Sequence, residues 1–262
     1  MPTTSNQPAR KGSGDPARSG NPAVRSAAAA TPAQAQPETA SRRRSTQRLL
    51  LGVLLGAVAV VLIAAISVFS WYNGHRDPVA PAAQPSFGPV TLTDGQPIVL
   101  GNTDAPVTLT LWEDFGCPHC DEFQKTLGPT IADLQRSGTI KVELYPMSFV
   151  TDRSPAQANA MACAAAEGFG ESYYAGLFAN YGLKWTDDQL VKLGSLVGRP
   201  TADFAGCVRS QQHAGWVDSI TRAAQQQKVE RTPTVFINGV RQGEEAATWS
   251  ADQLRSRIGA AK

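Results

Sequence analysis

The chain has 262 residues, of which 42% are hydrophobic and 7% aromatic, and this length allows one or two domains. Its formal net charge of +2 combines +6 in residues 1–48, where eight Lys and Arg face two acidic residues, with −4 in the remainder. Because the positive charge lies in an Ala-, Pro- and Ser-rich segment without aromatic side chains to stack on bases, these features argue against nucleic-acid binding.

Residues 1–48 are expected to form a disordered cytoplasmic tail. Within them, residues 1–41 are rich in Ala, Pro, Ser, Gln and Gly, and Val24 is the one aliphatic residue besides Ala and the initiator Met. A segment of this composition cannot bury enough apolar surface to offset its conformational entropy. We interpret it as an inert tail, with a binding role as the alternative.

Residues 49–72 are predicted to form a single transmembrane helix. They contain no charged residue and as a helix would span roughly 36 Å, enough for a hydrocarbon core of about 30 Å. Arginines precede the run, and Trp71 and Tyr72 end it as an interfacial aromatic pair. This charge pattern predicts a single-pass protein of the plasma membrane, with its N-terminus in the cytoplasm and its C-terminal domain outside.

Two alternatives exist for this apolar run. A core helix of a soluble domain would rarely be apolar on every face over such a length. A cleaved signal peptide is the stronger alternative, but a tail of 48 residues precedes the run, and the bulky Phe69, Trp71 and Tyr72 occupy the expected cleavage region. We therefore expect an uncleaved anchor.

Residues 73–97 read as a Pro-rich linker. Residues 77–97 contain five prolines, with Ala, Gln and Gly among them. This composition favours a semi-extended tether that would lift the following domain off the bilayer. Within it, residues 90–92 are a candidate edge strand.

A strand–helix–strand unit opens the folded domain, which is predicted at residues 98–262. Ile98–Leu100 and Val107–Trp112 have the apolar character of strands, and the second is apolar enough to be central in a sheet. The following run Asp121–Arg136 repeats apolar residues on one helical face. Thr139–Met147 then alternates apolar and polar residues, as a half-buried strand does.

An all-helical insertion is predicted at about residues 155–228, where no segment reads as a strand. Helical patterns run through residues 156–167, 172–181, from 185 onward, 202–210 and 215–227. Thr186 and Gln189 form a capping box at the third of these helices, and Trp185 can pack on Leu190 as a hydrophobic staple.

The α/β pattern resumes after the insertion. Residues 234–237 read as a strand, and Asn238-Gly239 is a strong signal for a type I′ hairpin leading into a return strand. Residues 249–254 repeat the capping-box arrangement and start a final helix.

The strongest chemical signal is the tetrad Cys117-Pro118-His119-Cys120 at the junction of a strand and a helix. At a helix N-terminus the first sulfur lies beside unpaired backbone N–H groups and the positive end of the helix dipole. This setting favours the thiolate, which is the reactive species in disulfide exchange. Pro118 suits the first helical turn, where its missing N–H costs no helix hydrogen bond.

A Cys-x-x-Cys is also half of a structural zinc site, which needs about two more ligands at close spacing. Cys163, Cys207, His75 and His213 stand alone or in unrelated contexts. The spacing therefore favours redox chemistry, and we expect no metal. The even number of cysteines suits a compartment in which disulfides persist.

These residues resemble the DsbA family of thioredoxin-fold disulfide oxidoreductases. The likeness covers roughly Phe87–Lys262 and rests on the tetrad, the strand before it and a later Thr232-Pro233. The sequence Glu113-Asp114-Phe115 before the tetrad is similar to membrane-anchored members of that family. The resemblance implies an α/β thioredoxin fold, with a central mixed sheet flanked by helices and an all-helical insertion, preceded here by the transmembrane helix.

The resemblance also implies roles for the site residues, with the whole tetrad in the catalytic site. Cys117 is the exposed nucleophile and Cys120 the more buried resolving partner, while His119 tunes the ionisation of Cys117. Thr232-Pro233 is expected to contain a cis peptide bond facing the cysteines, and Thr232 is expected to offer its backbone to a substrate strand.

Some of these residues have alternative interpretations. His119 could instead be a solvated histidine at a helix end. Glu113 and Asp114 alternate across the end of their strand, so one of them is a candidate proton acceptor near Cys120. The sequence does not decide which one, and two solvated carboxylates are the alternative.

Cys163 and Cys207 lie on different predicted helices of the insertion. Membrane-anchored proteins that resemble the DsbA family sometimes carry a second bridge of this kind. Here it would close a loop of about 45 residues and stabilise the fold by roughly 4 kcal/mol in the chain-entropy model. Two free, buried cysteines are the alternative.

Together, the residues and the resemblance predict a membrane-anchored thiol:disulfide oxidase that introduces disulfides into extracytoplasmic proteins. Its expected partners are reduced secreted or envelope proteins and, for reoxidation, a quinone-linked membrane oxidase as in the family. No organic cofactor is implied, and a monomer is expected. A thiol reductase or isomerase of the same fold is one alternative, and a non-catalytic envelope binding module is another.

Overall fold

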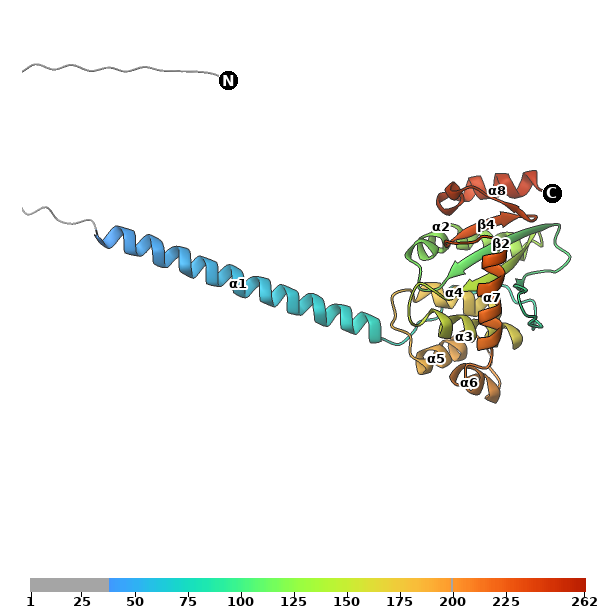
Figure 1. Cartoon of the computed structure of the whole chain (residues 1–262), viewed down its shortest axis with the longest axis horizontal. Coiled ribbons are helices and arrows are strands. Elements are labelled where there is room, and N and C mark those ends of the chain that lie inside the picture. Colours follow the sequence, from blue (N-terminus) through green and yellow to red (C-terminus); the bar gives the residue numbers. More distant parts are fainter. Residues whose placement is uncertain (1–37, 199) are drawn as a thin grey trace, which may run out of the picture. The chain divides into compact units, whose positions relative to one another are not determined.

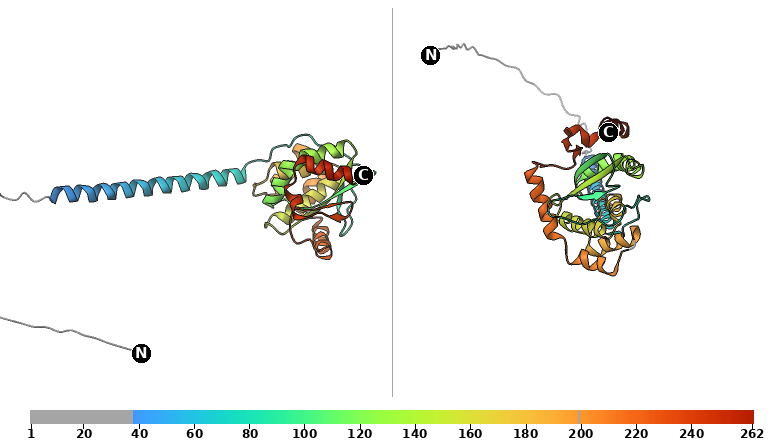
Figure 2. Two further views of the ribbon diagram at one scale, coloured as in Figure 1. Left: turned by 90° about the horizontal axis from the view of Figure 1, so that it is seen from above. Right: turned by 90° about the vertical axis from the view of Figure 1, so that its right-hand side faces the viewer.

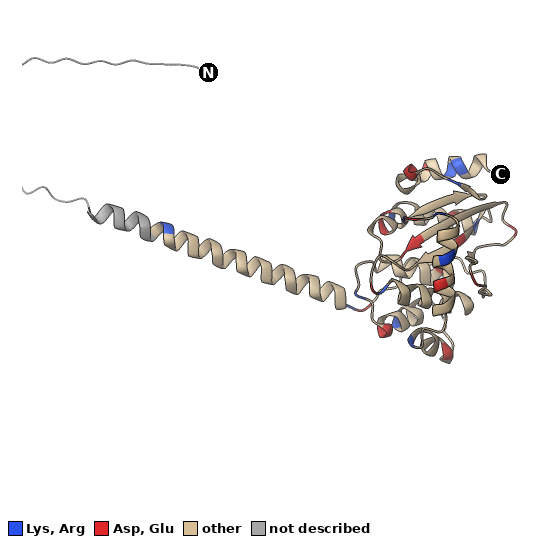
Figure 3. Cartoon of the chain, viewed as in Figure 1, with Lys and Arg blue, Asp and Glu red and all other residues tan. Residues whose placement is uncertain are grey.

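Helix α1 (Glu38–His75) is the first element of the computed structural model, which describes residues 38–198 and 200–262 (Figure 1). Its stretch Gln47–His75 is long and apolar enough to cross a membrane, and no charged residue interrupts the helix after Arg48 (Figure 3). The large apolar side chains of this stretch are exposed, as contact with lipid requires. The helix is therefore a candidate membrane span.

The predicted boundaries of this region differ from the observed helix. Helix α1 begins at Glu38 rather than at residue 49 and ends at His75 rather than at residue 72. Extending an existing helix needs no new nucleation, and Glu, Arg and Gln are good helix formers. The part of the predicted disordered tail before Glu38 lies outside the described residues.

Within the described part of the chain, a mixed five-stranded sheet has the order β1-β3-β2-β4-β5. Its strands are β1 (Ile98–Leu100), β2 (Val107–Asp114), β3 (Ile140–Met147), β4 (Thr234–Ile237) and β5 (Val240–Arg241). Strands β2 and β3 run parallel, and the other neighbours run antiparallel. The apolar β2 lies in the middle of the sheet and is buried along almost its whole length, which confirms the predicted central mixed sheet.

Helices α2 (Pro118–Arg136) and α8 (Ala251–Ala260) pack against each other, next to the short 3-10 helix η1 (Glu244–Thr248). Helix α2 begins earlier than the predicted Asp121, because Pro118 already occupies its first turn. Figure 1 and the right-hand view of Figure 2 place α8 at the opposite end of the domain from α6 (Ala202–Arg209).

The β4–β5 hairpin turns on Asn238 and Gly239, whose φ angles are 46° and 78°. Positive φ at both central positions of a two-residue turn is the signature of type I′, so the predicted hairpin is confirmed. The Oδ1 atom of Asn238 accepts the N–H of Thr108 at 2.8 Å, and this bond ties the turn to β2.

The predicted helical insertion lies between β3 and β4. Its helices are α3 (Ser154–Ala166), α4 (Gly170–Ala179), α5 (Asp187–Val197), α6 and α7 (Ala214–Gln226). The capping box predicted for α5 is formed: the Thr186 hydroxyl accepts the N–H of Gln189 at 3.2 Å, and Gln189 Oε1 accepts the N–H of Thr186 at 2.8 Å. The box predicted for α8 joins Ser250 and Gln253 in the same way.

The predicted linker is bound along the domain and is not a free tether. The backbone N–H of Val79 donates to Asn180 Oδ1 at 2.8 Å, and Asn180 Nδ2 donates to the Val79 carbonyl at 2.7 Å. Further along, Trp216 Nε1 donates to the carbonyl of Thr93 at 3.0 Å. Prolines remove backbone donors, so the remaining polar groups of this segment find partners among the side chains of the insertion.

The candidate edge strand at residues 90–92 is wrong. The N–H of Val90 donates at 2.9 Å to the carbonyl of Ala165 at the end of α3, so it is not available for a sheet neighbour. Val90 and Leu92 nevertheless pack against the core. Their apolar character therefore reflects contact with helices and not with strands.

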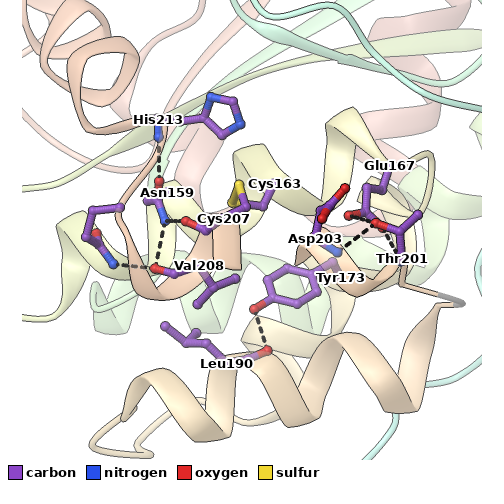
Figure 4. Close-up of a disulfide and its surroundings, with 11 residues drawn as sticks. Asn159, Cys163, Glu167, Tyr173, Leu190, Thr201, Asp203, Cys207, Val208 and His213 are labelled. Atoms are coloured by element: carbon purple, nitrogen blue, oxygen red, sulfur yellow. Dashed lines mark hydrogen bonds between the residues drawn. A yellow bond between two sulfur atoms is a disulfide. The ribbon is translucent and has the colours of Figure 1, made fainter. Parts of the chain in front are cut away.

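A disulfide joins Cys163 of α3 to Cys207 of α6, with the Cα atoms 6.1 Å apart (Figure 4). Beside it, Asn159 Nδ2 donates to the carbonyls of Cys207 at 3.4 Å and Val208 at 3.3 Å. Its Oδ1 atom accepts the N–H of His213 at 2.8 Å. The bond and this buried amide together link α3 to α6 and to His213, just before α7.

Replacing both cysteines, Cys163→Ala with Cys207→Ala, is expected to lower the free energy of unfolding by about 4 kcal/mol. The reason is that the bridge closes a loop with a sequence separation of 44 residues. Urea unfolding of the full chain in detergent, followed by Trp fluorescence, measures the difference. In a variant with Cys117→Ala and Cys120→Ala, adding a reductant should lower the free energy of unfolding by the same amount. A decrease below about 1 kcal/mol in both experiments would contradict the expectation.

Candidate active site

The tetrad lies where β2 ends and α2 begins. Cys117 is the N-cap residue of α2, and Pro118 is within its first turn. The N–H of Cys117 donates to the carbonyl of Asp114 at 2.9 Å, and the Cys117 carbonyl accepts the N–H of Asp121 at 3.1 Å. The first sulfur therefore lies at the end of the helix where backbone N–H groups lack partners within the helix.

The two cysteines are free thiols with different surroundings. The expected exposure of Cys117 is wrong: it is 5% exposed, because its sulfur lies against the Thr232 carbonyl, whereas Cys120 is 0% exposed on the buried face of α2. Pro118 and His119, between them, are exposed. A reagent or client that reaches this loop therefore meets Cys117 first.

Hydrogen bonds lower the pKa of Cys117 to about 5. The largest contribution is a hydrogen bond from Cys120, and smaller ones come from the side chain of Thr232 and the backbone N–H groups of Cys120 and His119, while partial burial opposes them. His119 thus contributes through its backbone. For Cys120 the direction is opposite: burial raises its pKa well above the ordinary thiol range, and its hydrogen bond to Cys117 raises it further.

The Thr232-Pro233 loop faces Cys117 from the start of β4. Its peptide bond is cis, and Pro233 is buried while Thr232 is half-buried. The Cys117 thiol lies 3.4 Å from the Thr232 carbonyl, to which it donates when protonated. The structure therefore brings together the tetrad and this loop, which are far apart in the sequence.

Asp114 is a structural carboxylate. Its Oδ1 atom accepts the N–H of Gly116 at 2.8 Å and the hydroxyl of Ser154 at 2.6 Å. Its Oδ2 atom accepts the N–H groups of Phe149 at 2.9 Å and Val150 at 3.0 Å. With these four donors the side chain joins the tetrad loop to the start of α3.

Glu113 is the carboxylate that lies near the two sulfurs. It is 0% exposed, and Gln124 Nε2 donates to its two oxygens at 3.0 and 3.1 Å. The Tyr174 hydroxyl donates to Glu113 Oε2. Burial raises the pKa of Glu113 to about 7, the two donors lower it, and the charge of Cys117 raises it again. This carboxyl can therefore gain or lose a proton near neutral pH.

Sequence reasoning missed Gln124 and Tyr174. Gln124 lies one turn after Cys120 on the buried side of α2, next to Phe123, and a polar residue on an apolar helix face was the available signal. For Tyr174, which reads as an ordinary core aromatic, the sequence offers no signal. Elsewhere, His213 proves to lie within 4.8 Å of the Cys163–Cys207 sulfurs, a contact that the sequence did not indicate.

Alkylation of the reduced protein by iodoacetamide tests the ionisation of Cys117. Because its pKa is lowered to about 5, the rate is expected to rise with pH around a midpoint near 5 and to be constant at neutral pH. Peptide mapping should find the label on Cys117 and not on the buried, protonated Cys120. In Cys120→Ala, which removes the main donor, the midpoint should move upward, and a wild-type midpoint above about 8 would contradict the assignment.

A family model described as thioredoxin matches residues 93–256, which is more than half of the chain. A comparison with curated proteins finds no match. Among solved structures, the disulfide bond oxidoreductase DsbG of Mycobacterium tuberculosis is 22% identical with a TM-score of 0.56, over 65% of this chain and 89% of that one. BdbD of Bacillus subtilis is 24% identical with a TM-score of 0.56, over 71% and 98% of the two chains.

MdbA of Actinomyces oris, a thiol-disulfide oxidoreductase, is 20% identical with a TM-score of 0.57, over 69% of this chain and 95% of that one. At such identities the likeness establishes a shared fold, and the predicted thioredoxin fold is confirmed. The region matched by the family model contains the whole sheet, the tetrad and the cis-proline loop. The chain therefore belongs to the thioredoxin family.

Proposed function

We propose that the chain is a membrane-anchored thiol:disulfide oxidase that introduces disulfide bonds into extracytoplasmic proteins. The observation that carries this proposal is the placement of the two sulfurs. Cys117 caps α2, and hydrogen bonds there lower its pKa to about 5, whereas Cys120 is 0% exposed, and burial raises its pKa. At neutral pH the reduced pair is therefore a thiolate beside a thiol. Because a stabilised thiolate favours the reduced form, the oxidised pair tends to pass its disulfide to a client.

The reaction begins when a client thiolate attacks the sulfur of Cys117 in the oxidised pair. A client–Cys117 disulfide forms, the Cys117–Cys120 bond breaks, and Cys120 leaves with the electron pair and takes up a proton. A second client thiolate then attacks the client sulfur of the mixed disulfide and releases Cys117 as a thiolate. The client has lost two electrons, and the cysteine pair has gained them.

Glu113 supplies the proton that Cys120 needs. Both Glu113 and Cys120 are 0% exposed, and after burial and the hydrogen bond to Cys117, the charge of the Glu113 carboxylate is a further cause that raises the pKa of Cys120. A neutral Glu113 can protonate Cys120 as it leaves, and an ionised Glu113 can take the proton back when the pair is reoxidised.

Two features beside Cys117 fit an unfolded polypeptide. The half-buried Thr232 presents backbone groups with which an extended client segment can pair, as in strand addition. Phe149 and Val150 are 54% and 37% exposed, and Asp114 holds their backbone next to the tetrad loop. Exposed apolar side chains at a reactive sulfur favour reduced secreted or envelope proteins, whose own apolar residues are still accessible.

The proposal also needs an anchor and an electron acceptor. The charge-free, exposed apolar surface of α1, preceded by a positively charged sequence, supports a single-pass plasma-membrane protein whose catalytic domain lies outside. Each turnover leaves the pair reduced, so another protein must remove two electrons. We propose that a quinone-linked membrane oxidase removes these electrons. We also propose that the protein is a monomer.

Oxidised full-length protein is expected to reactivate a reduced, unfolded enzyme that needs disulfides for activity, such as ribonuclease. Cys117→Ser should abolish this activity. In Cys120→Ala the lone Cys117 thiolate can attack a disulfide already present in a client and release a client thiolate, and this mixed disulfide should accumulate because Cys120 is missing to release it. Cys163→Ala with Cys207→Ala is the control and should retain the activity. Unchanged refolding with Cys117→Ser would indicate a binding module, and a strongly reducing potential in equilibrium with glutathione would indicate a reductase or isomerase.

Topology is tested in intact cells with a membrane-impermeant maleimide. In the Cys120→Ala variant lacking Cys163 and Cys207, Cys117 is expected to be labelled without permeabilisation. A cysteine introduced by Ser5→Cys into a chain without other cysteines should be labelled after permeabilisation. The reverse pattern would contradict the proposed orientation, and a mature protein lacking the tail would indicate cleavage.

A further inference from the structure

Glu113 is held by one residue from the tetrad helix and one from the insertion. Gln124 of α2 donates to its two oxygens, and Tyr174 of α4 donates to Oε2. Gln124 Nε2 also donates to the Tyr174 hydroxyl at 2.6 Å. The carboxyl, the amide and the phenol therefore form one closed network beneath Cys120.

The titratable groups that act on Glu113 are few. The thiols of Cys117 and Cys120 face it from the α2 side, and the Tyr174 phenol faces it from α4. Burial raises the pKa of Tyr174 well above its usual range, so this hydroxyl stays neutral. The Tyr174 oxygen can accept a proton from one side while its own hydroxyl proton passes to the other side. The side chain is a neutral phenol before and after such a transfer.

A cavity of about 380 Å³ borders this network at Gln124 and Tyr174. We call it the α2–α4 pocket, and its lining includes Gln124 and Tyr174 together with Lys125, Asp133, Arg136 and Glu171. Lys125, Asp133 and Arg136 are exposed, so the pocket reaches from the surface to the two residues that bind Glu113.

The active-site side offers a poorer route for protons. On that side Glu113 is 0% exposed, and the two sulfurs that interact with it are 0% and 5% exposed. During the reaction a client is covalently attached to Cys117 and covers this side. A proton that must reach Glu113 at this stage has a path that avoids the client through the α2–α4 pocket.

We infer that Tyr174 relays protons between the α2–α4 pocket and Glu113 while disulfide exchange takes place at Cys120. The inference rests on the proposed function. When Cys120 leaves as a thiolate, Glu113 gives it a proton and becomes a carboxylate; Tyr174 then gives its hydroxyl proton to Glu113 and takes one from solvent in the pocket. When the pair is reoxidised, the same proton moves outward. Tyr174 is a positioning residue that acts through Glu113.

The test uses the full chain with a preformed Cys117–glutathione mixed disulfide, from which the attack of Cys120 releases glutathione. Tyr174→Phe is expected to slow this release about tenfold or more at neutral pH and to displace its pH profile to higher pH, because Glu113 loses a donor that stabilises its charge. Infrared spectroscopy of the Glu113 carboxyl, identified with Glu113→Gln, should report the same displacement without reference to activity.

The matched control is Tyr173→Phe on the same helix. Tyr173 is also buried, but its hydroxyl donates to the carbonyl of Leu190 at 2.9 Å and not to Glu113. It should leave both the release rate and the carboxyl titration unchanged. Equal effects of the two variants, or no effect of Tyr174→Phe, would overturn the relay.

Two further measurements keep the outcomes distinct. Ala175→Leu narrows the α2–α4 pocket without removing a bond to Glu113, and it should slow glutathione release while leaving the carboxyl titration in place. Normal release in this variant would also overturn the relay, including in the case that Tyr174→Phe does not fold. If the wild-type mixed disulfide itself fails to form or to release glutathione, the proposed function fails first.

Discussion

The buried carboxylate of Asp114 is the constraint on which the site depends. It ends the central strand and accepts three backbone N–H groups and one hydroxyl, from the tetrad loop, the β3–α3 connection and the first turn of α3. Each of these donors, left without an acceptor in the interior, would cost about 1–3 kcal/mol. One side chain therefore holds three segments in place: the loop that carries Cys117, the exposed residues 149–150 and the first turn of α3.

The helical insertion contributes to the chemistry as well as covering the sheet. Its helix α4 brings Tyr174 to Glu113, and the ring of Phe115, just before the tetrad, packs on Tyr174 and Phe178 with centroids 6.2 and 5.3 Å apart. The tetrad and α4 thus share one aromatic core. Rearrangement of the insertion would change the protonation of Glu113, and through it the behaviour of Cys120.

Local signals made much of the fold predictable: the apolar β2, the Asn238-Gly239 turn and both capping boxes depend on residues close in sequence. The tetrad was recognisable for the same reason. The roles of Glu113 and Asp114 could not be separated from the sequence. Neighbouring strand residues point to opposite faces of the sheet, and the residues that bind each carboxylate are distant in sequence: Tyr174 is 61 residues from Glu113. The linker was misread for a similar reason, because the partner of Val79 is 101 residues away.

The bound linker limits how far the catalytic domain can travel. Helix α1 ends at His75, and Val79 is already fastened to Asn180. Four Cα–Cα steps lead from His75 to Val79, and fully extended they span about 14 Å. If α1 is the membrane anchor that we propose, this short connection would keep the domain close to the lipid surface, where it would encounter polypeptides before folding buries their cysteines.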